Sequence, residues 1–139
     1  MTGRFRGDER NLTGVWNGLY TYPDGRSTAF VATLIESGGS LTGTTHEQST
    51  LGKSPDATLF ASLAGSRHDS AVNFTKTYDR PDELHRSPIA YEGALNGEGS
   101  EIEGRWTIAR VWSGKFLMIR LPGQEAKASR QVFERTRSD

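Results

Sequence analysis

The chain has 139 residues, with 17 basic and 17 acidic side chains and no cysteine. This length suits one domain, which can bury close to ~70% of the surface that its unfolded chain exposes. The balanced charge argues against nucleic acid as a partner, since binding phosphates requires an excess of Lys and Arg. The lack of cysteine excludes disulfides, thiolate metal sites and thiol nucleophiles.

Residues 1–10 are rich in charged side chains and are interpreted as an N-terminal tail. A signal peptide needs an apolar segment that this tail lacks. The most apolar run of the chain, residues 116–119, is far shorter than the ~20 residues that span a bilayer. We therefore expect a cytoplasmic protein without membrane contact, and a secreted chain whose signal has been removed is the alternative.

Residues 11–122 form the predicted domain, in which short strands alternate with glycine-rich turns. The expected strands are 12–22, 27–36, 41–48, 57–64, 71–78, 89–95, 101–109 and 115–121, with turns placed at Gly65 and at 112–114. Eight runs at this spacing are typical of an all-β sandwich or barrel. We predict an eight-stranded antiparallel up-and-down β-barrel, because closure removes exposed sheet edges. Residues 123–139 are left as a C-terminal segment, a tail or a short helix over 124–133.

The run 101–109 has the clearest alternation in the chain. Ile102 and Trp106 share one face, while Glu101 and Glu103 share the other. The charged face must be outside, so the apolar face points into the domain. The same reasoning places Tyr91 of the preceding run inside. It predicts an interior that is largely uncharged.

The motif Gly14-Val15-Trp16 in the first strand resembles the Gly-x-Trp that opens barrels of the calycin superfamily. Calycins commonly place an Arg in the last strand, where it packs across that Trp and closes one end of the barrel. Arg120 occupies the matching position here. Trp16 and Arg120 are therefore expected to form this structural pair, with cation–π attraction offsetting part of the cost of burying the charge.

Within the calycins the order of short motifs is most similar to avidin and streptavidin. Residues 12–16, 39–43 and 104–106 follow that family's order and rough spacing. The family's first-strand Asn is displaced, because Gly18 stands at the matching place, and the last strand lacks the family's Asp. Without these partners the buried polar atoms of biotin would each cost ~1–3 kcal/mol. A biotin site is therefore not expected.

On the calycin-like interpretation the first strand turns Trp16, Tyr20 and Tyr22 inward. We predict that a small, partly aromatic organic ligand binds on Tyr20, Tyr22, Tyr91 and Trp106. The alternative is that these aromatic side chains fill the core, with hydroxyls that reach the rim or water. Small eight-stranded barrels can do either.

No catalytic residue, metal site or cofactor is predicted. The chain has no nucleophile elbow and no phosphate-binding loop, and its three histidines have no metal-ligand spacing. Some calycin-like barrels act as lyases or isomerases through inward Tyr, Arg and Glu. That function would require an inward carboxylate beside a tyrosine, and the sixth and seventh strands supply none.

The last strand is apolar on both faces. If Arg120 turns inward, then Leu117, Ile119 and Leu121 face outward and need cover. A homo-oligomer interface would provide it, and the C-terminal segment folded over the strand is the alternative. The sequence thus favours a non-catalytic barrel that binds a small molecule, and a filled barrel with a structural or protein-interaction role is the competing hypothesis.

Overall fold

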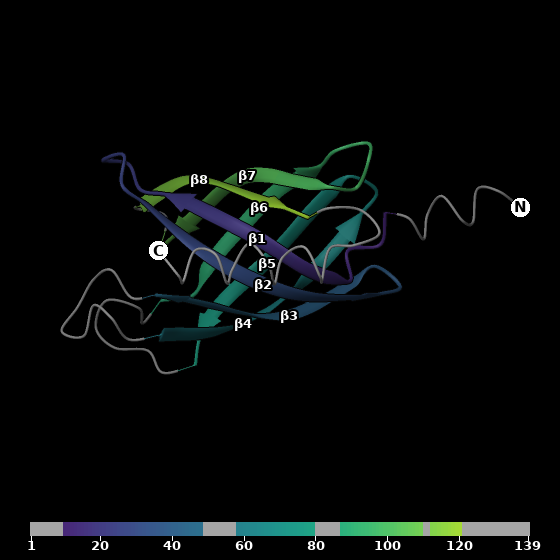
Figure 1. Cartoon of the computed structure of the whole chain (residues 1–139), viewed down its shortest axis with the longest axis horizontal. Helices are drawn as coiled ribbons and strands as arrows, with labels where there is room; N and C mark the ends of the chain where they lie inside the picture. The colour runs from purple at the N-terminus through teal and green to yellow at the C-terminus, as the bar shows by residue number, and fades with distance from the viewer. Residues whose placement is uncertain (1–9, 49–57, 80–86, 110–111, 121–139) are drawn as a thin grey trace, which may run out of the picture.

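The computed structural model describes residues 10–48, 58–79, 87–109 and 112–120. They form eight strands: β1 (Gly14–Thr21), β2 (Ser27–Ser37), β3 (Ser40–Gln48), β4 (Thr58–His68), β5 (Ala71–Tyr78), β6 (Ile89–Leu95), β7 (Glu101–Ile108) and β8 (Trp112–Ile119). Consecutive strands pair antiparallel, and β1 also pairs with β8, so that the sheet closes (Figure 1). The predicted all-β, up-and-down barrel is confirmed, and the sandwich alternative is wrong.

Two strands are longer than predicted, because glycines expected in turns lie inside strands. β4 continues through Gly65 to His68, and β8 begins at Trp112 and includes Gly114. A Cβ at Gly65 would lie 2.0 Å from the carbonyl oxygen of Asn73, and one at Gly114 would lie 1.9 Å from that of Thr21. These glycines therefore permit a close approach of neighbouring strands rather than a reversal of the chain.

The two ends of the barrel differ in their side chains. The tight hairpins β2–β3 and β4–β5 and the connection from β6 to β7 lie at the end where β1 begins, opposite the β1–β2 turn (Figure 1). We call this the capped end; Asn11, Thr13, Trp16, Gly99 and Arg120 define it. The opposite end, where β1, β3, β5 and β7 finish, is the aromatic end, defined by Tyr22, Trp106 and Trp112.

The barrel interior is filled by alternate residues of all eight strands. Its buried apolar residues include Leu34, Leu41, Leu63, Val72, Phe74, Leu95, Ile102, Phe116 and Met118. Leu117 and Ile119 face outward from β8 and are half-buried and 40% exposed, respectively. Leu121, the N-terminal tail up to residue 9 and the predicted C-terminal segment lie outside the described residues. Within those residues no helix has the length and apolar character that a membrane span requires.

Candidate functional site

A buried ion pair lies inside the barrel near the aromatic end. The Nζ atom of Lys76 donates to Oε1 of Glu47 at 2.7 Å, and the two side chains are 1% and 2% exposed. The hydroxyls of Tyr20 and Tyr78 both donate to Oε2 of Glu47, at 2.6 and 3.1 Å. We call these four residues the interior polar cluster. The expectation of a largely uncharged interior is therefore wrong.

The strand register explains how the pair forms. Glu47 is on β3 and Lys76 is on β5, with β4 between them. Ala61 of β4 is paired with Thr45 on one side and with Tyr78 on the other. Since alternate residues of a strand share a face, Glu47 and Lys76 point inward on either side of Ala61. Its short side chain leaves room for the two long ones to meet.

Aromatic rings surround the Lys76 ammonium. Nζ lies 4.9 Å from the ring centroids of Tyr20 and Tyr78, 5.1 Å from that of Phe30 and 5.9 Å from that of Tyr91. Ring faces attract a cation at such distances. An ammonium has three N–H donors, and the single acceptor found for Nζ among the described residues is Glu47. The rest of its surroundings is therefore a low-polarity, aromatic cage.

Burial changes the acid–base behaviour of these side chains. Desolvation raises the pKa of Tyr20 and Tyr78 far above its ordinary value, and the nearby Glu47 carboxylate raises it further. The pKa of Tyr91 is raised too, again mainly by burial. Desolvation lowers the pKa of Lys76, although the Glu47 carboxylate works in the opposite direction. The tyrosines therefore remain neutral hydrogen-bond donors throughout the physiological range.

Thr45 lies beside the cluster and contributes an unsatisfied polar atom. It precedes Glu47 by two residues on the inner face of β3 and is 2% exposed. Its Oγ1 atom has no hydrogen-bond partner among the described residues. Its strand neighbours are Ala32 and Ala61, which are both small and buried. A buried hydroxyl without a partner costs ~1–3 kcal/mol, so this position suits a further polar group inside the barrel.

Aromatic side chains gather at the aromatic end. The Tyr22 ring centroid lies 5.8 Å from that of Trp106 and 5.5 Å from that of Trp112. Tyr20 packs edge-on against Tyr22, at 5.6 Å, and connects this group to the interior polar cluster. Nε1 of Trp106 donates to the carbonyl oxygen of Thr21, which fixes the indole. Trp112 is 42% exposed, so one ring of the group faces solvent.

The four residues predicted to bind a ligand are all buried and belong to one core cluster, in which three of them are in mutual ring contact. Tyr20, Tyr22 and Trp106 are in mutual ring contact. Tyr91 lies deeper, stacked on Phe74 at 4.9 Å. It is also the cross-strand partner of Trp106 in the β6–β7 pair, and its ring faces the Lys76 ammonium. A ligand that touched all four side chains would therefore have to reach from the aromatic end into the aromatic cage.

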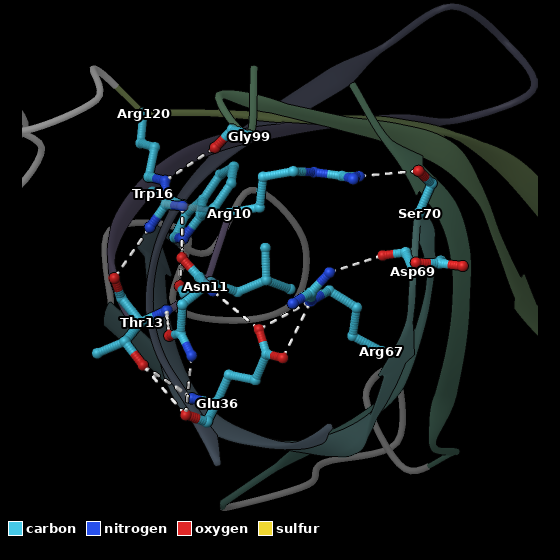
Figure 2. Close-up of polar contacts among 11 residues, drawn as sticks. Arg10, Asn11, Thr13, Trp16, Glu36, Arg67, Asp69, Ser70, Gly99 and Arg120 are labelled. Carbon is cyan, nitrogen blue, oxygen red and sulfur yellow. Dashed lines mark hydrogen bonds and ion pairs between the residues drawn. The ribbon is translucent and has the colours of Figure 1, made fainter. Parts of the chain in front are cut away.

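The capped end is closed by Arg120 and Trp16 (Figure 2). The Arg120 guanidinium lies 4.5 Å from the Trp16 ring centroid. Its nitrogens donate to the carbonyl oxygens of Gly99, Thr13 and Asn11, at 3.1, 2.9 and 2.5 Å. Three acceptors and one ring face compensate the buried charge. Arg120 thus ties the end of the barrel domain to the segment that precedes β1.

A second ion pair supports the capped end. Nε of Arg67 donates to both carboxylate oxygens of Glu36, at 2.9 and 3.0 Å, and Oε1 of Glu36 accepts from the backbone N–H of Leu12 at 2.9 Å. Figure 2 shows these contacts across the barrel mouth from those of Arg120. Arg10 reaches Ser70 on the β4–β5 turn. The Glu36 carboxylate and the Arg67 guanidinium bind each other and nearby backbone. We therefore interpret the capped end as a structural feature of the barrel.

Glu47, Lys76 and Tyr78 were not predicted from the sequence. An enzyme of this fold would need an inward carboxylate beside a tyrosine, and Glu47 is such a carboxylate, on a strand whose inner face the sequence pattern does not identify. The signal was available in β5, where Val72, Phe74 and Tyr78 alternate with polar residues and Lys76 falls on their face. A charged residue on an apolar face marks a buried ionic site.

The two histidines that the structure describes, His46 and His68, do not face the barrel interior. His46 is half-buried on the outer face, with its ring centroid 6.3 Å from that of Phe60. His68 is the last residue of β4 and is exposed, and His85 lies outside the described residues. In the part of the chain that the structure describes, no three His, Asp or Glu side chains gather as a metal site would require.

Comparison with solved structures finds designed barrels. The chain is similar to a redesigned β-barrel, with a TM-score of 0.62 and 13% identity over 79% of this chain and 91% of that one. It is also similar to the redesigned β-barrel mFAP1 bound to DFHBI (TM-score 0.61, 13% identity, 81% and 97% covered). A fluorescence-activating β-barrel designed de novo gives a TM-score of 0.58 at 11% identity, with 81% and 96% covered.

These likenesses show the fold and no more. No protein-family model matches the chain, and no curated protein matches its sequence. The resemblance to calycins and avidins therefore stays a prediction from the motifs.

Proposed function

We propose that this barrel binds a small, partly aromatic molecule without catalysing a reaction. The ligand enters at the aromatic end and lies against Tyr22 and Trp106. Its polar group reaches Thr45 and the interior polar cluster. The similar barrel mFAP1 is bound to DFHBI in its structure, which supports small-molecule binding by a barrel of this fold.

The observation that carries the proposal is the combination of Glu47, Lys76 and the unpartnered Oγ1 of Thr45 on the inner wall. A barrel that served only as a scaffold would be as stable or more stable with apolar residues in place of a buried ion pair. An unsatisfied hydroxyl beside that pair adds a further cost. Both costs are accounted for if a ligand completes the hydrogen bonding.

A thermal-shift screen of aromatic compounds, with DFHBI as the first probe, tests the proposal. Binding compounds raise Tm. Thr45→Val weakens their binding about fivefold while leaving the ligand-free protein folded, since the loss of one hydrogen bond to a ligand is worth ~1 kcal/mol. Trp106→Phe, which keeps an apolar ring, weakens binding through lost contact area. A screen without a single stabilising compound, together with a Thr45→Val protein that behaves as wild type, would contradict the proposal.

Exposed apolar side chains on the outer face of the barrel favour a second function, self-association. A row of register partners crosses five neighbouring strands. It runs from Ile119 on β8 through Asn17 on β1, Val31 on β2 and His46 on β3 to Phe60 on β4. Ile119 and Phe60 at the two ends of this row are 40% and 57% exposed, and Leu19 beside it is 42% exposed. We propose that this surface pairs two copies of the chain, as expected for an exposed apolar sheet face.

Native mass spectrometry and light scattering test self-association directly. Phe60→Lys shifts the distribution to monomer, whereas Ser62→Lys, a neighbouring exposed position on the same strand, leaves it unchanged. A monomeric wild-type protein at high concentration would refute the interface.

A further inference from the structure

We propose that Lys76 forms a reversible covalent imine with an aldehyde that enters the barrel from the aromatic end. The inference rests on the proposed ligand-binding function and names its ligand class, aromatic aldehydes. It starts from the surroundings of Nζ, which combine one carboxylate, four ring faces and almost complete exclusion of water.

The first requirement is a neutral amine, because an ammonium has no lone pair for attack. Glu47 Oε1 is 2.7 Å from Nζ and can accept its proton directly. No other acceptor among the described residues replaces the two hydrogen bonds that the remaining N–H groups would make in water. Desolvation accordingly lowers the pKa of Lys76, and buried lysines of this kind serve as Schiff-base nucleophiles.

The second requirement is a balanced path for protons. Glu47 takes one proton from the ammonium, and the Nζ lone pair forms a bond to the carbonyl carbon. The carbonyl π electrons move to oxygen, which receives the proton that Glu47 holds. Nitrogen then gives its second proton to Glu47, which passes it to the hydroxyl as water leaves. The overall change is ammonium plus aldehyde to iminium plus water, with no oxidant or reductant.

The third requirement is a stable product. The iminium keeps the positive charge of Lys76, so the carboxylate of Glu47 remains its counter-ion. The rings of Tyr20, Phe30, Tyr78 and Tyr91 remain around the charge and offer stacking surface to an aromatic aldehyde. Tyr20 and Tyr78 keep Oε2 of Glu47 occupied, so Oε1 is the oxygen that serves Lys76. The interior polar cluster would therefore make the same contacts with the Lys76 ammonium and with the iminium product.

Lys76 lies near the aromatic end. It is two residues before Tyr78, the last residue of β5, and β5 finishes at that end. Tyr20, which is 7% exposed, lies between Tyr22 and the ammonium. An aldehyde therefore passes the same Tyr22 and Trp106 rings that the proposed function assigns to ligand binding.

Reductive trapping tests the proposal on the intact protein. We expect benzaldehyde with cyanoborohydride at neutral pH to add a benzyl group that peptide mapping places on Lys76. The exposed Lys115 in the same molecule is the internal control. A lowered pKa raises the neutral fraction of an amine at a given pH, so Lys76 should be labelled before Lys115. Lys76→Met should lose the fast label, and Lys115→Arg should keep it.

The outcomes separate this inference from the proposed function. If Lys115 is labelled first and Lys76 reacts only in urea, the imine is refuted and the ion pair is structural. If benzyl alcohol, which has the same ring without a carbonyl, binds while Lys76 stays unlabelled, the imine is again refuted although ligand binding survives. Wild-type mapping decides the matter even if Lys76→Met fails to fold.

Discussion

The contributions of Glu47 and Lys76 to the free energy of unfolding should depend strongly on each other. Lys76→Met leaves the Glu47 carboxylate with two tyrosine donors but no cation, and Glu47→Gln leaves the Lys76 ammonium without an anion. Removal of one partner of a buried pair costs ~3–5 kcal/mol. The double variant Glu47→Gln/Lys76→Met carries no charge at this site, and the amide oxygen of its glutamine still accepts hydrogen bonds from the tyrosine hydroxyls. We expect it to be far closer to wild type than the sum of the single variants.

The magnitude follows from the exposures. With side chains 1% and 2% exposed, solvent cannot screen the charge that remains, so each single variant should lose at least ~3 kcal/mol of the ~5–15 kcal/mol typical of a domain. The coupling energy of the cycle should therefore reach ~3 kcal/mol or more. Arg26→Met is the matched control, since its partner Asp24 is 56% exposed and such pairs contribute below ~1 kcal/mol.

Equilibrium unfolding in guanidinium chloride at pH 7, followed by tryptophan fluorescence, measures all four proteins of the cycle. Trp106 and Trp16 are buried and report on both ends of the barrel. If the two single costs add to the double cost within ~0.5 kcal/mol, the residues do not interact and the described cluster is wrong.

Three further predictions concern other parts of the barrel. Burial raises the pKa of Tyr20, Tyr78 and Tyr91 in the folded protein. Their contribution to the free energy of unfolding is therefore complete below the unfolded value of ~10 and is lost above it, at up to ~4 kcal/mol per pH unit for three protons. Urea unfolding from pH 9 to 11.5 should show this decline, and a flat profile would contradict it. Gly65→Ala should prevent folding or cost more than ~3 kcal/mol, because the added Cβ would overlap the backbone of the neighbouring strand. Gly97→Ala, with open space around it, should change stability by less than ~0.5 kcal/mol. Equal changes in Tm for the two variants would disprove the close approach of the strands at Gly65. Arg120→Met should cost ~3 kcal/mol or more in chemical unfolding, because three carbonyl oxygens lose their donor, and a cost below ~1 kcal/mol would mean that water replaces it.

The sequence was sufficient for the barrel because its strands carry period-two alternation. The inward face of β7 could be identified from Ile102 and Trp106 opposite a charged row, and both residues are buried. Strand ends were less predictable at Gly65 and Gly114, because the same residue type serves turns and close strand contacts. The difference depends on what lies across the sheet, which the local sequence does not contain.

The interior polar cluster was harder to predict than the fold. Glu47 and Lys76 are 29 residues apart in the chain, on strands that are not neighbours, so no local spacing relates them. A polar residue on an apolar face can be seen from the sequence, but its partner depends on the register of three strands. The resemblance to calycins drew attention to Trp16 and Arg120 at the capped end, and away from the strands that carry the charges.

The closure of the sheet has a consequence for the order of folding. β1 finds its second partner only in β8, and Arg120 bonds to the carbonyl of Asn11, which lies 109 residues earlier. Such distant pairings slow folding, since much of the chain must be ordered before they form. During synthesis β1 and β7 would present open edges until β8 leaves the ribosome. A chain truncated before β8 should therefore expose the unpaired edges of β1 and β7 and aggregate rather than form a smaller barrel.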